Sequence, residues 1–274
     1  MKIIMRPPSE AFRQAISKHP LSSRIDPAEA LRQHEVLRAA MTEAGADVEL
    51  LPADPVNPDA PFVQDVMITF PPPDDPAGRS VLLVATRPGA PARRPEVESV
   101  VAAARALVPA ACRLLTIEEP GTLDGGDVLL YGDRVVIGLS GRTNRAGAEQ
   151  LAGALRAIGY RVFLCPVTDD RLHFASAITR VRATRFIGTA VGFADLDAGG
   201  DDVLPRAEID RVVIPDDESP AHNVVLIGDT LFVPAGNPVS VGLLRDAGEH
   251  VVEVEFSQFT WADAGLTCLM GAVY

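Results

Sequence analysis

Four residues of this sequence could act chemically on one substrate if the fold brings them together. They are a cysteine, a histidine and two aspartates: Cys268, His173, Asp65 and Asp124. A cysteine thiolate is a nucleophile, an imidazole transfers protons near neutral pH, and a carboxylate orients the imidazole and favours its protonated form. The set indicates nucleophilic catalysis by Cys268. The alternative for this residue is a cysteine buried in the core.

Asp124 lies in the most unusual stretch of the chain, TLDGGDVLLYGDRVVIGLSGRTN at 122–144. Gly125 and Gly126 permit a tight backbone turn between Asp124 and Asp127. Carboxylates crowded around such a turn need a cation or protons to relieve their repulsion. A simple hairpin is the alternative interpretation of this stretch.

Metal and disulfide chemistry have little support. The five histidines contain no pair at metal-ligand spacing, and the three cysteines are far apart and form no CxxC pair. We therefore expect no metal site and no disulfide framework. Cys112 and Cys165 lie in apolar, strand-like runs, which favours core positions for both.

Five similar segments could bring the reactive residues together. Each has a strand, a polar loop and a second strand, and the first strands fall within 45–54, 111–120, 159–170, 209–219 and 248–259. A period near fifty predicts a closed, repeated architecture rather than a doubly wound sheet, with equivalent strand starts close to a central axis. The residues at the starts of the second strands are Asp65, Asp124, His173, Asn223 and Cys268, which are 59, 49, 50 and 45 positions apart.

Helices are expected between the strands, over 28–45, 95–108, 147–159 and 238–248. Apolar residues recur there at helical spacing, and glycines or a first-turn proline mark several of the ends. Strands alternating with helices predict an α/β protein. We expect a Pro-rich loop at 70–80 and an acidic, Gly-rich irregular segment at 192–208. No linker divides the chain, so the sequence predicts one domain over 1–274.

The composition limits the partners. The chain carries a formal charge of −12, which disfavours nucleic acid and is compatible with a small cationic substrate. No apolar run approaches the ~18 residues that a membrane-spanning helix needs, and the first residues do not read as a signal peptide. We therefore expect a cytoplasmic protein that binds neither membrane nor nucleic acid.

Six segments, in order along the whole chain, resemble motifs of the dimethylarginine dimethylaminohydrolases. They are FVQD, TRPGAPARR, TLDGGDVL, GLSGRTN, LHFASA and GLTCL. These enzymes belong to the guanidine-modifying, or amidinotransferase, superfamily, whose pentein fold is a five-bladed α/β propeller. The resemblance implies this fold here, with fivefold pseudosymmetric ββαβ-type repeats.

The resemblance also implies an activity: hydrolysis of asymmetric dimethylarginine or monomethylarginine to citrulline and dimethylamine or methylamine. Cys268 would attack the guanidinium carbon and form a covalent thiouronium. His173 would protonate the departing amine and then activate water, and Asp124 would be the acidic partner of His173. No metal or organic cofactor is implied. A homodimer is compatible with the resemblance.

The family motifs assign substrate-binding roles to further residues. This sequence departs from the family pattern at Gln64, in FVQD where the family has FVED. The neutral amide can still accept a hydrogen bond, but the negative charge of the glutamate is missing, and we expect this loss to alter affinity or substrate choice. Arg93 and Arg142 would hold the substrate carboxylate by bidentate contacts. The other implied contacts are the carboxylates of Asp59 and Asp65, the ring of Phe62 and the backbone of Asp263.

Two other readings stay open. Within the same chemistry, the chain could be a deiminase of arginine or a related guanidino compound, or an amidinotransferase-superfamily enzyme of other specificity. From another class, it could be a silent scaffold that kept the propeller. The reactive triad and both arginines count against a scaffold, which has no need of them.

Overall fold

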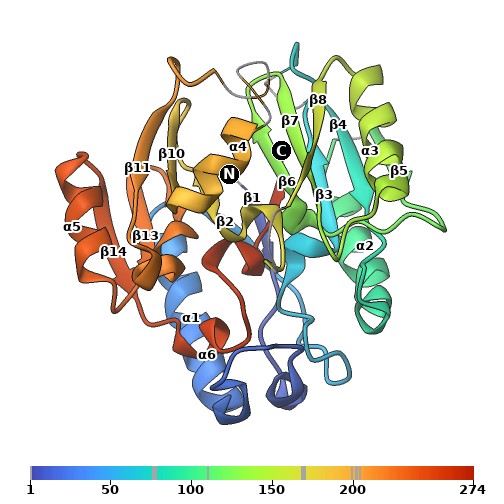
Figure 1. Cartoon of the computed structure of the whole chain (residues 1–274). Helices are drawn as coiled ribbons and strands as arrows, with labels where there is room; N and C mark the ends of the chain where they lie inside the picture. The colour runs from blue at the N-terminus through green and yellow to red at the C-terminus, as the bar shows by residue number, and fades with distance from the viewer. Residues whose placement is uncertain are drawn as a thin grey trace.

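The described residues fold into a ring of five small sheets. The computed structural model describes residues 2–75, 79–109, 111–167, 171–198, 200, 203 and 205–274. Within these residues each sheet has three strands, in the orders β15–β1–β2, β3–β4–β5, β6–β7–β8, β9–β10–β11 and β12–β13–β14. The expected five-bladed α/β propeller is confirmed, and helices such as α2, α3 and α5 lie on its outer side (Figure 1).

The strands are short and evenly distributed along the chain. Their bounds are β1 Lys2–Met5, β2 Asp47–Leu50, β3 Met67–Phe70, β4 Ser80–Ala85, β5 Ala111–Thr116, β6 Val128–Tyr131, β7 Arg134–Leu139, β8 Arg161–Pro166, β9 Ile178–Arg180, β10 Arg185–Gly188, β11 Asp210–Val213, β12 Val225–Ile227, β13 Thr230–Pro234, β14 His250–Val254 and β15 Gly271–Val273. The α-helices are α1 Pro27–Glu43, α2 Val97–Leu107, α3 Arg145–Ala157, α4 Ala190–Ala198, α5 Pro238–Asp246 and α6 Ser257–Thr260.

One unit is repeated in every blade. The inner strand pairs antiparallel with the middle strand, and a helix then leads to an outer strand parallel to the middle one. In the second blade, for example, β3 pairs with β4, and α2 connects β4 to β5. The two strands of each predicted segment therefore belong to neighbouring blades, because the polar loop between them crosses from one blade to the next.

The two ends of the described chain share a blade. β1 pairs antiparallel with β15, with Lys2 opposite Val273, and parallel with β2. Both ends of the trace lie near the middle of the view in Figure 1. The ring is thus closed by the pairing of its first strand with its last.

Local sequence explains the helices that were predicted. Asp26 caps α1 by accepting a hydrogen bond from the Ala28 N–H, and Pro27 occupies the first turn. Asn144 caps α3 through the Gly147 N–H. Apolar side chains then pack between blades. The rings of Phe70 and Tyr160, for example, contact edge to face with their centroids 6.0 Å apart.

One expected irregular segment begins as a helix. Part of 192–208 belongs to α4, Ala190–Ala198, which buries Phe193 and Leu196 against the core. Gly192 permits this packing, because a Cβ there would overlap the carbonyl group of Ala177. Tertiary contact thus stabilises a helix that its glycine content disfavours.

The expected loop at 70–80 has no helix or strand over 71–75, and 76–78 lie outside the described residues. In the part of the chain that the structure covers, no helix combines the length and the apolar character needed to cross a bilayer.

Candidate active site

A short 3-10 turn precedes each inner strand, and each turn contains or directly adjoins one of the five residues that the repeat aligned. Val63–Asp65 ends with Asp65, Gly125–Asp127 follows Asp124, and Phe174–Ser176 follows His173. In the remaining two blades, Asp216–His222 precedes Asn223, and Leu266–Leu269 contains Cys268. The repeat therefore places these residues at the same end of the inner strands.

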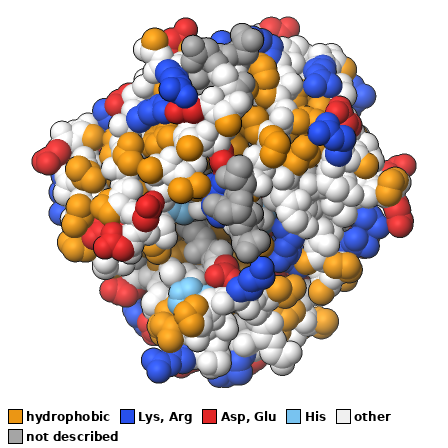
Figure 2. Space-filling view, in the orientation of Figure 1, with side chains coloured by type: hydrophobic (Ala, Val, Ile, Leu, Met, Phe, Trp, Pro, Cys, Tyr) orange, Lys and Arg blue, Asp and Glu red, His pale blue; other side chains and the backbone are white. Residues whose placement is uncertain are grey.

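Four of the five line a single pocket of about 510 Å³: Asp65, His173, Asn223 and Cys268. Asp124 lies behind His173 and is fully buried. The space-filling view shows the hollow near the middle of the visible face, with histidine and acidic side chains at its edge (Figure 2). Residues up to two hundred positions apart thus share one site.

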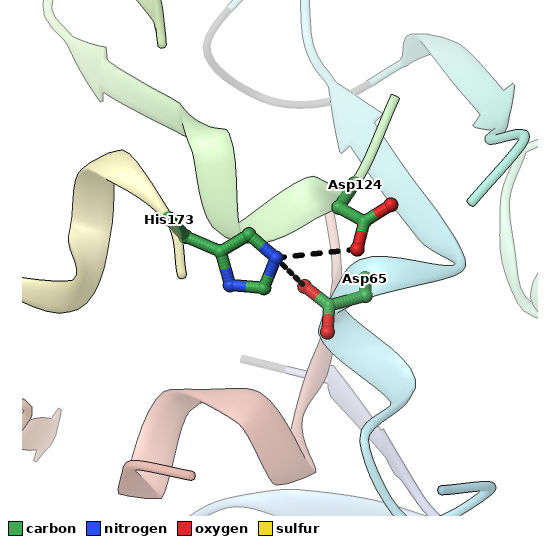
Figure 3. Close-up of side chains that lie close together, drawn as sticks. All are labelled: Asp65, Asp124 and His173. Carbon is green, nitrogen blue, oxygen red and sulfur yellow. Dashed lines mark hydrogen bonds and ion pairs between the residues drawn. The ribbon is translucent and has the colours of Figure 1, made fainter. Parts of the chain in front are cut away.

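His173 is held by two carboxylates from two other blades. Its Nε2 lies 3.2 Å from an Asp124 oxygen and 3.9 Å from an Asp65 oxygen (Figure 3). Burial alone would lower the pKa of His173, but the charge of Asp65 and the hydrogen bond to Asp124 raise it to about 9. The imidazole is therefore protonated at neutral pH, and Nδ1 is the nitrogen that these carboxylates leave for other partners.

The two aspartates are themselves fixed. Asp124 accepts a hydrogen bond of 2.8 Å from the Gly89 N–H, and Asp65 accepts one of 3.0 Å from the Gly126 N–H. Gly126 is needed at this point, because a Cβ there would lie 2.7 Å from His173 Nδ1 and 3.0 Å from Asp65 Oδ1. The unusual GG pair of the sequence therefore lets the imidazole and the carboxylate approach the turn closely.

Arg93 lines the pocket, is only 4% exposed and is fully engaged. It donates to Asp65 at 2.6 Å, to Glu96 at 2.9 Å and to the Phe62 carbonyl at 2.9 Å. Burial raises the pKa of Asp65, but His173 and Arg93 outweigh it and hold the value below the ordinary range. Burial raises the pKa of Glu96 to about 7 despite its pairing with Arg93. Arg93 thus acts on Asp65, and a substrate carboxylate would have to replace one of its present partners.

Cys268 is partly buried within its 3-10 turn, and its N–H donates to the Gly265 carbonyl. Burial, with a further contribution from the charge of Asp65, raises the pKa of its thiol to about 12. The thiol is therefore neutral in the free protein at neutral pH. A cation bound beside it would favour the thiolate.

The remaining predicted residues occupy the pocket wall and rim. Phe62, Gln64 and Arg142 line the pocket, and Arg142 lies 4.0 Å from the nearest Asp124 oxygen. Asp59 is buried and accepts a hydrogen bond from the Ile16 N–H. Asp263 has a positive φ of 57°, and its carboxylate accepts from the Lys18 N–H at 2.6 Å. All of the predicted substrate-binding residues therefore lie in or beside the one pocket.

Several pocket residues were missed by the sequence analysis. Residues 16–19 and His222 line the pocket, and Thr267 bonds to two pocket residues. Asn223 was aligned by the repeat, but no role was assigned to it. Thr267 lies in the GLTCL segment, where only Cys268 was assigned a role. Residues 16–19 and His222 lie in none of the six segments, because their position depends on loops that meet only in the folded ring.

Asp65, Asp124 and His173 have the donor types of a cation site, and their nearest ligand atoms lie within 4.8 Å of one another. The protonated imidazole of His173, however, has no lone pair to offer a metal ion. Sequence spacing could not reveal this group, because its members come from three blades. Arg93 already supplies a positive charge to Asp65, and the protonated His173 supplies a second.

Comparison with known proteins gives several full-length similarities. The chain is 36% identical over 269 residues to an N(G),N(G)-dimethylarginine dimethylaminohydrolase of Streptomyces coelicolor, covering 98% of this chain and 95% of that protein. Among solved structures, it is similar to a Pseudomonas aeruginosa DDAH cysteine-to-serine variant complexed with citrulline, at 27% identity and a TM-score of 0.86 over 98% of both chains. A dimethylarginine dimethylaminohydrolase variant, as an adduct with S-methyl-L-thiocitrulline, matches with the same identity, coverage and TM-score. The sequence profile of the arginine deiminase family matches residues 102–163.

Proposed function

The chain belongs to the dimethylarginine dimethylaminohydrolase family, and from that premise we propose that it hydrolyses N-omega-methylated arginine to citrulline and an alkylamine. The structural observation that supports this most is the pocket in which a thiol, an imidazole and carboxylates meet, although they come from different blades. A silent scaffold would have no need of that convergence.

The electrostatics of the pocket suit a guanidinium. Asp65 is buried and its pKa is held below the ordinary range, so it is charged at neutral pH. A guanidinium is planar and has N–H groups that pair well with carboxylates. We assign Asp65 to the guanidinium. Phe62, whose ring lies at the pocket wall, is assigned to the apolar methyl end.

The reaction begins with the neutral thiol of Cys268. The bound cation lowers the pKa of the thiol, which loses its proton to solvent or to a basic group, and the thiolate sulfur bonds to the guanidinium carbon. The protonated His173 then donates a proton to the departing dimethylamine or methylamine as the C–N bond breaks. A covalent thiouronium on Cys268 remains.

Water completes the cycle. The now neutral His173 removes a proton from water, whose oxygen attacks the thiouronium carbon. The C–S bond breaks, the sulfur takes up a proton, and the ureido group of citrulline is formed. Asp124 favours the protonated imidazole through its 3.2 Å contact with Nε2, so Nδ1 is the nitrogen assigned to proton transfer.

The rest of the substrate extends toward the pocket rim. We assign the substrate α-carboxylate to Arg142, because the guanidinium of Arg142 is 4.0 Å from its nearest carboxylate, whereas that of Arg93 is tightly paired. Arg93 can still join this contact by exchanging a partner. The backbone of Asp263 is assigned to the substrate ammonium. Asp59 supports the rim through Ile16 and adds negative charge.

The proposal also covers the protein as a whole. We propose that 1–274 acts as one domain, in the cytoplasm and as a homodimer, with small guanidino compounds as its ligands. A homodimer is compatible with the family resemblance, and light scattering on the purified chain would determine its mass.

Citrulline formation from a panel of guanidino compounds tests the activity. The panel contains asymmetric dimethylarginine, monomethylarginine, arginine and agmatine, and we expect the two methylated compounds to give the highest kcat/KM. Cys268→Ser should lower kcat by roughly 10³-fold or more while the fold is kept. Cys112→Ser is the matched control, since Cys112 lies on β5 and should tolerate the change.

Two results would contradict the proposal. Arginine as the best substrate would favour a deiminase, the function suggested by the profile match over 102–163. Turnover at the wild-type rate in Cys268→Ser would remove the covalent mechanism.

A further inference from the structure

Gln64 is part of a hydrogen-bond chain that determines which end of its amide faces the pocket. The residue before Asp65, Gln64 is partly exposed and lines the pocket. Its Oε1 accepts a hydrogen bond of 3.0 Å from the Thr267 hydroxyl. Thr267 directly precedes Cys268, so the amide lies beside the turn that carries the thiol.

Backbone chemistry fixes the first link of this chain. The Thr267 N–H can only donate, and it lies 2.8 Å from Asn223 Oδ1. The other arm of the Asn223 amide is therefore Nδ2, which donates to Thr267 Oγ1 at 3.1 Å. Gly265 permits this approach, because a Cβ there would overlap the Asn223 side chain.

The orientation of Gln64 follows from that of Asn223. The Thr267 hydroxyl already accepts a hydrogen bond from Asn223, and its own proton needs an acceptor, which Gln64 Oε1 supplies. The reverse orientation of the Gln64 amide would turn its NH2 toward Thr267 and leave the hydroxyl proton without that acceptor. Donation along the chain also polarises the Gln64 amide and makes its N–H groups better donors.

The Gln64 NH2 group is therefore the arm that is free to meet a ligand. Among the described residues it has no hydrogen-bond partner, and the side chain is not closed off from the pocket. A guanidinium offers only N–H donors and cannot accept a hydrogen bond from this group. A ureido group has a carbonyl oxygen that can.

We propose that Gln64 is a specificity residue that makes the pocket favour ligands with an oxygen acceptor at the reacting end, above all the ureido product, over the guanidinium substrate. This inference rests on the proposed function, because that function supplies both ligands. It predicts an enzyme that binds its product citrulline strongly relative to its substrate.

The substitution Gln64→Glu tests this with little change of shape. One carboxylate oxygen can still accept from Thr267, and the other then faces the pocket as an ionised acceptor. A guanidinium gains a charge-assisted hydrogen bond, whereas a ureido oxygen meets a second acceptor. We expect the Kd of asymmetric dimethylarginine to fall by roughly tenfold and the Kd of citrulline to rise by roughly tenfold.

Calorimetry on Cys268→Ser protein measures both constants without turnover. The matched control is Thr267→Val, which removes the hydroxyl but keeps the backbone N–H bonded to Asn223. This change frees the Gln64 amide to turn. The Kd of asymmetric dimethylarginine should therefore fall and the Kd of citrulline should rise, as with Gln64→Glu, but each only by about threefold.

The outcomes separate the two proposals. Opposite shifts of the two constants support the role of Gln64, whereas shifts in the same direction, or an unchanged constant for citrulline, overturn it while the proposed function stands. If neither ligand binds the Cys268→Ser protein with Gln64 intact, the proposed function is contradicted and this inference with it.

Discussion

The floor and the rim of the pocket are built in different ways. The pocket floor is defined as Asp65, His173 and Arg93, which line the pocket, together with their partners Asp124 and Glu96 behind them; all five are at least nine-tenths buried. The pocket rim is residues 16–19 and Asp263; the Lys18 N–H donates to Asp263, and the Ile16 N–H donates to the buried Asp59. At the floor, every charged group has an opposite charge within hydrogen-bond or ion-pair distance. At the rim, the Ile16 side chain is 43% exposed, and Asp263 is exposed as well.

This difference indicates that the floor residues determine the reaction chemistry, whereas the rim residues determine access of the substrate to the pocket. Buried ion pairs with satisfied hydrogen bonds hold one geometry, and removal of one partner leaves an uncompensated charge. Hydrogen bonds at an exposed loop compete with water and contribute little each. Changes at the floor should therefore affect turnover and stability, whereas changes at the rim should affect KM.

Among the substitutions that test the difference between floor and rim, Gly126→Ala at the floor is expected to have the largest effect. The added methyl would lie 2.7 Å from His173 Nδ1 and 3.0 Å from Asp65 Oδ1, so the imidazole would have to shift from its contacts with Asp124 and Asp65. We expect kcat to fall by roughly 100-fold, since small displacements of catalytic groups are costly. Steady-state citrulline formation would measure the loss.

A matched glycine substitution is available on α5. Gly242 has no atom within 4 Å of the position of an added Cβ. Gly242→Ala should therefore keep the wild-type kcat. Equal kcat values for Gly126→Ala and Gly242→Ala would show that the floor tolerates displacement of its catalytic groups as readily as the surface does.

The second prediction concerns the pH dependence of stability. The folded pKa of His173 is about 9, above its unfolded value of about 6.5. Its stabilising contribution is therefore fully present below the unfolded pKa and is lost as pH rises through the folded one. Between about pH 7.5 and about pH 9, the free energy of unfolding should fall by on the order of 2 kcal/mol.

Urea unfolding at the two pH values would measure this change. Glu96, with a pKa of about 7, is largely ionised throughout that interval. In His173→Gln, the free energy of unfolding should change little between the two pH values, whereas Asp263→Asn at the rim should show the same decrease as the wild type. If the decrease persists in His173→Gln, it arises from the titration of other groups.

The smallest effect is expected at the rim. Asp263→Ala removes the acceptor of the Lys18 N–H and the Ser17 hydroxyl, and it also places alanine at a φ of 57°. We expect KM for methylated arginines to rise by about threefold, with little change in kcat. Asp263→Asn is the control, because asparagine tolerates positive φ and its Oδ1 can still accept. A large fall in kcat in Asp263→Ala would place the rim within the catalytic machinery.

The sequence predicted the convergence of the reactive residues because the propeller is periodic. Asp65, Asp124, His173 and Cys268 occupy equivalent turns, and equivalent turns of a closed ring must meet. The predicted helices were recognisable from apolar periodicity and caps such as Asn144. These features depend on local sequence and on symmetry, both of which can be read from the chain.

Contacts that break the symmetry could not be predicted in this way. Residues 16–19 reach the pocket from the long connection between β1 and α1, which the segments recognised in the sequence did not include. Arg93 was expected to hold a substrate carboxylate, but its pairing with Asp65 depends on how the 87–96 segment packs under the pocket. The orientation of the Gln64 amide depends on Asn223, which lies 159 positions further along the chain. The helix α4 was missed because packing of Gly192 against Ala177, rather than propensity, stabilises it.

The pairing of β1 with β15 has a consequence for protein synthesis. A chain still on the ribosome has made β1 long before the strand that closes its blade, and Cys268 is added only three residues before that strand. Nascent chains therefore carry acidic residues of the pocket without the proposed nucleophile. Translation that stops early leaves an open ring with no thiol at position 268, so the proposed chemistry becomes available only at the moment when the ring can close.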